Sequence, residues 1–284
     1  MEELFNIYNK MGLILSNSNG SLGRLRMYLT IPSSVDPDAQ AFITAAGITD
    51  PTQQSAINTL VVDLKAYGVW TKMKALYPFV GGTASAHKFN LKDPRDLDAA
   101  FRLVFSGGWT HSATGALPNG TNAYADTFYT PSTSGELNSA HLSYYSRTNN
   151  TQTRCMMGCY DSLSPNVRRH YFGQGLSFSS LNSTLEGNYA PVNYFGHHLI
   201  KRENSLETKQ IRNGIIIVTS TIVSTNRPIV PVYIAAANLN NTSAQLYSTL
   251  QCAFASIGDG LTDTEAANFY TAVQAYQTTL SRNV

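Results

Sequence analysis

Charged side chains are scarce in this sequence. Lysine and arginine contribute 20 residues and aspartate and glutamate 18, so 13% of the 284 residues are charged, against roughly 25% in an average soluble domain. The net charge of +2 includes no basic block, and binding a nucleic-acid backbone depends on one. Nucleic acid is therefore not an expected partner, and the polarity must come from uncharged side chains.

Long hydrophobic runs are also missing. The longest candidate, Ile215 to Val218, ends at Thr219 and Ser220, whereas a bilayer span needs about 20 apolar residues. Glu2 and Glu3 stand where a secretory signal carries positive charge. We therefore expect neither membrane insertion nor classical export.

Cysteine is rare, with three in the chain. Cys155 and Cys159 lie in a segment predicted to be extended, which would place their Cα atoms about 13 Å apart, well beyond the roughly 7 Å that a disulfide tolerates. His170 does not complete a recognised zinc pattern with them. The cysteines are interpreted as buried thiols of a protein folded in a reducing cytoplasm.

The first half of the chain predicts an arm and then helices. Residues 16–21 are serine, asparagine and glycine, a composition typical of turns and linkers. Residues 1–35 are therefore predicted to be either an N-terminal arm or a first β-hairpin. Asp-Pro pairs at 36–37 and 50–51 resemble helix starts, and the glycines at 47 and 68 resemble helix ends. A third helix is predicted over 70–77.

After residue 84 the pattern changes to short β-branched and aromatic runs between turns, which predicts strands. Asn213-Gly214 is the strongest hairpin signal. The polar stretches 106–127 and 131–138 are predicted to be loops, and Thr262 with Glu265 predicts a capped helix over 263–281. The strand segments are 103–105, 140–145, 154–160, 198–201, 215–223, 232–236 and 252–256.

Residues 231–238 and 253–265, the latter with a Gly-Asp-Gly-Leu-Thr-Asp-x-Glu turn from 258 to 265, resemble the closing strands of concanavalin-like, or laminin-G-like, β-sandwiches. The resemblance implies a mainly β fold: an antiparallel β-sandwich of the jelly-roll type, with an N-terminal helical module and a C-terminal helix. The expected domains are 1–35 (arm), 36–83 (helical module) and 84–284 (sandwich).

Residues 38–48, 64–70 and 77–82 resemble a module common in tail, fibre and other virion proteins of bacteriophages. The resemblance implies a virion protein, assembled in the cytoplasm of a bacterial host, with other virion proteins as partners. A homo-oligomer is also expected, trimeric if the protein forms a fibre, because an N-terminal arm of this kind needs something to pair with.

The sequence offers little for catalysis. Glycosidases of this type of sandwich place acidic residues in alternation on one strand so that two carboxyl groups meet across the bond, and no such run exists here. There is also no nucleophile elbow or Walker loop. A non-enzymatic protein is expected, and a glycan-cleaving enzyme is the weakest alternative. The isolated glutamates are Glu136, Glu186, Glu203 and Glu207.

Metal sites are weakly indicated. His197 and His198 are adjacent on a predicted strand and therefore point to opposite faces. Asp93, Asp96 and Asp98 resemble a calcium loop loosely, and helix capping is the favoured interpretation. No cofactor is expected, with calcium left open because related sandwiches often bind it.

Binding is better indicated than catalysis. Sugars stack their CH-rich faces on aromatic rings, while their hydroxyls need amide and hydroxyl partners. The predicted loops combine both, although the ring of Trp109 has a core position as its alternative. We therefore predict a tail-fibre or receptor-binding adhesin for host-surface glycan, with a purely architectural head, collar or tail protein as the alternative. The candidate ligand-binding residues are Trp109, His111, Asn119, Asn122, Tyr124 and Tyr129.

Overall fold

The structure is a computed structural model that describes residues 13–14, 28–29, 35–150, 154–162, 168–174, 179–183 and 193–284. The chain divides into two compact units, Met1–Val35 and Asp36–Val284. In the first unit, β1 (Leu13–Ile14) and β2 (Tyr28–Leu29) form an antiparallel pair. The rest of the predicted arm, including the turn at 16–21, lies outside the described residues.

The second unit begins with the two predicted helices, which are confirmed. They are α2 (Pro37–Ala45) and α3 (Pro51–Ala66). Asp36 Oδ1 accepts the N–H of Asp38 at 3.0 Å, and Asp50 Oδ1 accepts the N–H of Gln53 at 2.8 Å. Each aspartate therefore satisfies one N–H that the first helical turn leaves without a partner.

The predicted helix over 70–77 is wrong. A short 3₁₀ turn, η1 (Trp70–Lys72), leads into β3 (Met73–Tyr77), which pairs antiparallel with β18 (Cys252–Gly258). The Asn90 side chain also accepts the N–H of Leu76 at 2.9 Å. Partners distant in sequence thus override the helical spacing of the apolar residues, which a local pattern does not reveal.

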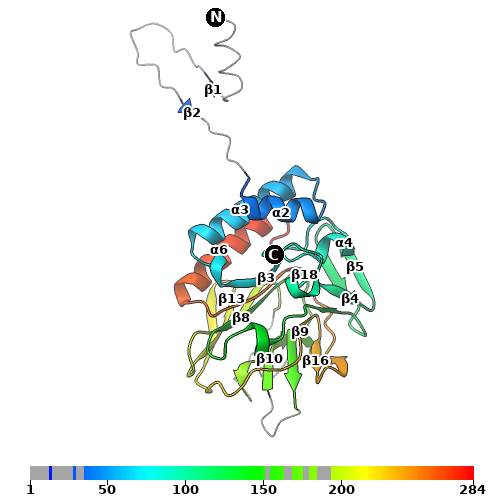
Figure 1. Ribbon diagram of the computed structural model, residues 1–284, viewed down its shortest axis with the longest axis vertical. Helices are drawn as coiled ribbons and strands as arrows, with labels where there is room; N and C mark the ends of the chain where they lie inside the picture. The colour runs from blue at the N-terminus through cyan, green and yellow to red at the C-terminus, as the bar shows by residue number, and fades with distance from the viewer. Residues whose placement is uncertain are drawn as a thin grey trace, which may run out of the picture. The chain divides into compact units, whose positions relative to one another are not determined.

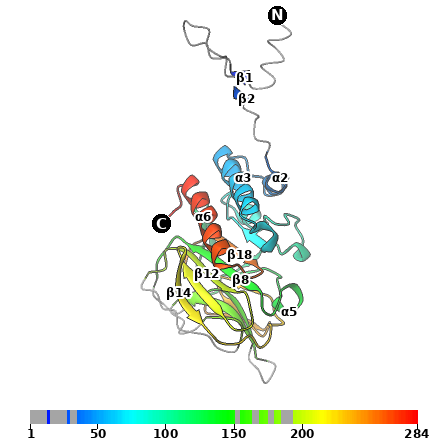
Figure 2. The same cartoon turned by 90° about the vertical axis from the view of Figure 1, so that its left-hand side faces the viewer.

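Two sheets form the body of the second unit (Figures 1 and 2). In the first, the described strands run β14-β13-β12-β8-β18-β6-β5, with β3 beside β18; in the second they run β11-β10-β9-β15-β7-β4, with β16 and β17 attached through β9. Their pairs are antiparallel apart from β16 with β9. The chain is therefore mainly β and forms an antiparallel β-sandwich with flanking helices, as predicted.

The bounds of the first sheet are β5 (Trp109–Ser112), β6 (Gly115–Pro118), β8 (Ala140–Ser146), β12 (Gly196–Arg202), β13 (Thr208–Arg212) and β14 (Ile215–Ser220). Those of the second are β4 (Val104–Ser106), β7 (Tyr124–Asp126), β9 (Arg154–Asp161), β10 (Arg168–Gln174), β11 (Ser180–Ser183), β15 (Tyr233–Ile234), β16 (Ala237–Leu239) and β17 (Ser243–Gln245). All seven predicted strand segments overlap one of these strands or β18. The remaining short turns are α4 (Ala84–His87), η2 (Asp98–Ala100) and α5 (Pro131–Ser134).

The predicted loop over 106–127 is wrong in part, because β5, β6 and β7 lie within it. Its polar residues alternate with small buried ones such as Ala116 and Ala125. The strands of this stretch are four residues or shorter, and their few apolar side chains gave no clear period-2 signal.

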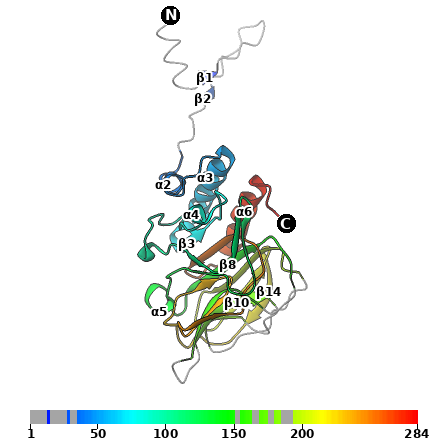
Figure 3. The ribbon, with the colours of Figure 1, turned by 90° about the vertical axis from the view of Figure 1, so that its right-hand side faces the viewer.

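Two hydrophobic clusters hold the second unit together. One fills the space between the sheets, with Leu142, Met157 and Ile234 among its members. The other lies between the first sheet and α2, α3 and α6 (Asp263–Thr279), with Phe42 and Phe269 among its members. Figure 3 shows these helices gathered on one side of the sandwich. The residues of the helical module therefore share a core with the first sheet.

The hairpin and the C-terminal helix are confirmed. Asn213 (φ 47°) and Gly214 (φ 78°) both have positive φ between β13 and β14, as a type I′ turn requires. At the start of α6, Thr262 Oγ1 accepts the N–H of Glu265 at 3.1 Å, and Glu265 Oε2 accepts the N–H of Thr262 at 2.7 Å. The predicted capping box is thus complete.

All three cysteines are buried thiols, as predicted. Within the described residues, none of the helices is both long and apolar enough to cross a bilayer.

Candidate functional site

The structure brings Trp109, His111 and Tyr124 into contact, with the rings of Trp109 and His111 stacked at 6.1 Å between centroids, but it does not form one exposed surface from the six predicted ligand-binding residues. Trp109 is half-buried, and its Nε1 donates to the carbonyl oxygens of Ser106 (3.0 Å) and Tyr124 (3.2 Å). Its ring lies edge-on to that of Phe105, with centroids 5.3 Å apart. Trp109 therefore packs against the core between the sheets, the alternative position that the sequence left open for it.

His111 belongs to the same ring cluster. Its ring meets Phe105 edge-on at 4.6 Å, and its Nδ1 lies 2.9 Å from Nδ1 of His87. One of these nitrogens must donate and the other accept, so the pair cannot carry two protonated rings. Burial, followed by the neighbouring His111, lowers the pKa of His87 to about 3. The pair is consequently neutral near pH 7 and joins α4 to β5.

Asn119 and Asn122 are exposed, but their side chains are engaged in the turn after β6. Asn119 Oδ1 accepts the N–H groups of Thr121, Asn122 and Ala123 at 3.0, 3.1 and 3.2 Å. Asn122 Oδ1 accepts from Asn119 Nδ2 at 2.7 Å and from the Gly108 N–H at 3.0 Å. The oxygens of these two amides therefore shape the turn, and only their Nδ2 donors are left for a ligand.

Tyr129 is buried, with 1% of its surface exposed and its ring edge-on to Phe101 at 5.4 Å. The expectation that it belongs to an exposed platform needs correction, because this ring is part of the core between the sheets.

Tyr124 is the predicted residue that the structure places on an open sheet face. Register pairs Ser106 with Tyr124, Val104 with Asp126, and Asp126 with Tyr233. Paired residues, and residues two apart on one strand, share a face, so all five lie on one face of β4, β7 and β15. Their neighbours Ala125 and Ile234 point to the core and are fully buried. We call this outer surface the tyrosine face.

Within the tyrosine face, Tyr124 stacks on Tyr233 with ring centroids 4.5 Å apart and an interplanar angle of 20°. Tyr124 and Asp126 are half-buried, and Tyr233 is 9% exposed. Tyr233 therefore supports the ring of Tyr124, and Tyr124 remains partly exposed. The face combines a predicted ring, a carboxylate and a hydroxyl group, that of Ser106, on one partly exposed sheet surface.

Asp126 is electrostatically unusual. Its Oδ1 accepts the N–H of Phe128 at 2.8 Å, which favours the charged form. Burial, together with the charge of Asp98, nevertheless raises its pKa. Such a carboxylate is a strong acceptor for hydroxyl groups and disfavours a second negative charge beside it. The sequence signal for this outer face is the alternation Tyr124-Ala125-Asp126, which at three residues is too short to predict a strand face by itself.

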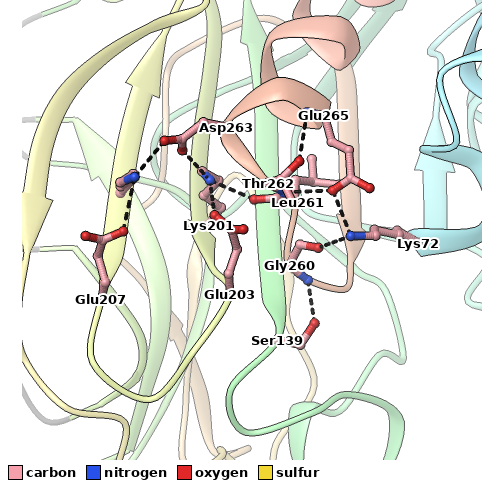
Figure 4. A network of polar contacts seen from close by, with 11 residues as sticks. Lys72, Ser139, Lys201, Glu203, Glu207, Gly260, Leu261, Thr262, Asp263 and Glu265 are labelled. Carbon is pink, nitrogen blue, oxygen red and sulfur yellow. Dashed lines mark hydrogen bonds and ion pairs between the residues drawn. The ribbon is translucent and has the colours of Figure 1, made fainter.

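Two glutamates considered for catalysis, Glu203 and Glu207, lie in one ion-pair network (Figure 4). Lys201 Nζ contacts Glu203, and it lies 2.6 Å from Asp263 Oδ1 and 2.7 Å from the carbonyl oxygen of Leu261. Lys209 Nζ joins Asp263 Oδ2 at 2.7 Å to Glu207 Oε1 at 3.1 Å. Each carboxylate is thus bound to an ammonium group, whereas a glycosidase pair faces the substrate.

A serine–histidine contact not expected from the sequence lies beneath α6. His141 Nδ1 donates to the carbonyl oxygen of Asp259 at 2.6 Å, so its Nε2 accepts from Ser256 Oγ at 3.1 Å. Ser143 Oγ lies 2.6 Å from Ser256 Oγ. This arrangement resembles an activated nucleophile, but all three side chains are fully buried. A substrate cannot reach it while α6 is in place.

Metal ligands are not assembled in the described part of the chain, where no group of three His, Cys, Asp or Glu side chains could hold an ion. The aspartates of the calcium-like cluster form ion pairs instead: Asp93 with Arg95, and Asp96 and Asp98 with Arg102. This also corrects the helix-capping interpretation, because their oxygens bind side chains of the same loop. His197 and His198 are both buried.

No protein-family model matches the chain, and no curated protein matches its sequence. Domain 4 of an extracellular GH43 arabinanase from Geobacillus stearothermophilus, solved with arabinotriose, has a TM-score of 0.38 at 13% identity, covering 70% of this chain and 98% of that one. A Trypanosoma rangeli sialidase mutant with trans-sialidase activity scores 0.44 at 9% identity, covering 78% and 39%.

The botulinum neurotoxin serotype G binding domain scores 0.39 at 10% identity, covering 71% of this chain and 51% of that one. The chain thus spans well under half of the sialidase. The TM-scores are low, so these likenesses carry no argument about what the chain does.

Proposed function

We propose that this protein is a non-enzymatic carbohydrate-binding component of a bacteriophage virion, which recognises host-surface glycan through the tyrosine face. One observation carries the proposal: a half-exposed tyrosine ring, held flat by a stacked partner, lies beside a carboxylate on an open sheet face. Aromatic rings bind the CH-rich faces of sugars, and carboxylates accept their hydroxyl groups.

The virion setting rests on the resemblance of residues 38–48, 64–70 and 77–82 to virion proteins. The non-enzymatic character is supported by the lysine contacts of Glu203 and Glu207 and by the burial of Ser256. A purely architectural virion protein is the alternative, in which the tyrosine face would contact protein neighbours.

A glycan array probed with the full-length chain tests the proposal. Selective binding that is lost in Tyr124→Ala, with the melting temperature retained, supports it. The matched control is Tyr67→Ala. This tyrosine is 37% exposed and directly follows the helix α3, so it is not part of the sheet that contains Tyr124. Silence across glycans representative of bacterial surfaces favours the architectural alternative, and turnover of a polysaccharide would overturn the non-enzymatic assignment.

A further inference from the structure

Asp126 is a carboxylate without a cationic partner. Its side chain is half-buried in the tyrosine face, and among the described residues no lysine, arginine or histidine forms an ion pair with it. The neighbouring Asp98, in contrast, is paired with Arg102 at 2.7 Å. A carboxylate that is partly removed from water without a cation is destabilised. The position of Asp126 therefore favours a positively charged group from outside the chain.

The neighbours of Asp126 strengthen its preference for a cation. Val104 lies directly opposite Asp126 on β4, and Tyr233 lies opposite it on β15. Both side chains are uncharged, so they shield the carboxylate from water without offsetting its charge. Burial raises the pKa of Asp126, and the charge of Asp98 raises it further. Both effects disfavour the negative charge of Asp126 on its own and would be relieved by a positive charge beside it.

The stacked tyrosines supply the other half of an ammonium-binding site. Ammonium groups bind to the faces of aromatic rings, and the attraction grows as water is excluded. Tyr124 stacks on Tyr233 at 4.5 Å and remains partly exposed, two positions before Asp126 on β7. In the part of the chain that the structure describes, no lysine or arginine lies over either ring. Rings and carboxylate therefore share one face without the cation that both attract.

The same chain shows how such a site looks when it is filled. Lys65 Nζ lies 5.5 Å from the centroid of the Trp70 ring and 2.6 Å from Asp36 Oδ1. One ammonium group thus contacts an aromatic ring and a carboxylate at once, and both partners come from the protein. On the tyrosine face the ring and the carboxylate are present, so the ammonium group has to come from the ligand.

We propose that the tyrosine face binds a protonated amino sugar, whose ammonium group lies against the ring of Tyr124 and the carboxylate of Asp126. This inference rests on the proposed glycan-binding function and names the class of sugar. The net charge of the chain is +2, so the protein as a whole does not attract a cationic ligand. A preference for such a sugar therefore reports the local carboxylate.

Titration calorimetry of the full-length chain at about pH 6, well below the pKa of an ordinary amine, compares the tetramer of N-acetylglucosamine with the tetramer of glucosamine. The glucosamine tetramer should bind about tenfold more tightly. Asp126→Asn should reduce this preference to about twofold, while the remaining side-chain oxygen still accepts the N–H of Phe128. The control is Asp63→Asn, which should leave the preference unchanged. Asp63 is a half-buried aspartate on α3 that likewise forms no ion pair with the described residues.

The outcomes separate this inference from the proposed function. Equal or weaker binding of the glucosamine tetramer, while neutral glycans bind through Tyr124, overturns the inference and leaves glycan binding intact. A preference that a folded Asp126→Asn variant retains overturns it as well. Silence toward both tetramers and across the glycan array removes the proposed function and the inference with it. Choline that binds through Asp126 as tightly as the glucosamine tetramer would show that a bare ammonium group is the ligand, and would overturn the assignment to a sugar.

Discussion

Lys201 Nζ lies 2.6 Å from Asp263 Oδ1, and this contact fastens the first turn of α6 to β12 (Figure 4). The lysine side chain is 1% exposed, and its remaining contacts are to Glu203 and the carbonyl oxygen of Leu261. Three oxygens therefore surround a buried ammonium group, which occupies the kind of oxygen cage that would suit a metal cation. In this fold a side chain of the protein supplies that positive charge.

Lys201→Met should lower the free energy of unfolding. Removing one partner of a buried pair costs about 3–5 kcal/mol, and because water reaches Glu203 and Asp263 we expect about 2 kcal/mol here. Urea denaturation measures the loss. Lys209→Met is the matched control, since Lys209 is more exposed and shares Asp263, and it should cost less than about 1 kcal/mol. Equal losses in the two variants would show that burial of Lys201 is not the cause.

Acid should destabilise the protein before its carboxylates titrate. Burial lowers the pKa of His141 and of His198 to about 4, and that of His197 to about 3, from an ordinary value of 6.5. The unfolded chain therefore binds more protons than the folded one below pH 6.5, so stability falls as the pH drops from 6.5 toward 4. Each histidine contributes a slope of up to about 1.4 kcal/mol per pH unit.

His197→Leu isolates one of these contributions. Among the described residues, neither ring nitrogen of His197 has a hydrogen-bond partner, and the ring packs against Phe269 and Tyr270. The variant should be at least as stable as the wild type at pH 7. Between pH 6.5 and 4.5 its free energy of unfolding should fall less steeply, by up to about 1.4 kcal/mol per pH unit, because unfolding takes up one proton fewer. Urea titrations across this range measure both quantities. An unchanged slope would mean that His197 does not take up the proton on unfolding.

The parts of the fold set by local chemistry were predictable. Asp36, Asp50 and the Thr262–Glu265 box marked helix starts, and Asn213-Gly214 marked a hairpin, because each acts on backbone groups within four residues. β3 was not predictable in this way, since its hydrogen bonds go to β18.

The candidate site was likewise predictable only in the features that local sequence determines. The sequence indicated the polar and aromatic composition around Tyr124, but not which rings face outward. Tyr233 joins Tyr124 only through the register of β15 with β7, more than a hundred positions apart in the chain. The engagement of Asn119 and Trp109 in local hydrogen bonds likewise depends on a turn that composition alone does not define.

Asn119→Ala should damage the turn rather than ligand recognition. The change leaves three N–H groups without their acceptor, and we expect a loss of about 1–2 kcal/mol in the free energy of unfolding. Asn119→Asp is the matched variant, because it keeps the accepting oxygen and loses only the Nδ2 donor to Asn122. Thermal and urea denaturation should place Asn119→Asp between the wild type and the alanine variant. A loss of glycan binding by a folded Asn119→Asp variant would instead show that Asn119 belongs to the ligand site.

Asp126 should determine the charge class of the sugar that the tyrosine face binds. A carboxylate beside Tyr124 repels sialic or uronic acids, so neutral glycans should bind more tightly than acidic ones of similar size. Asp126→Asn should reduce this discrimination by about tenfold, since one charge is removed next to the ligand. The control is Asp38→Asn, which removes an equal charge from an exposed ion pair with Lys65 on α2 and α3 and should change the ratio little. Titration calorimetry with matched neutral and acidic oligosaccharides measures the ratio, and a wild-type preference for acidic sugars would rule out Asp126 as the selecting group.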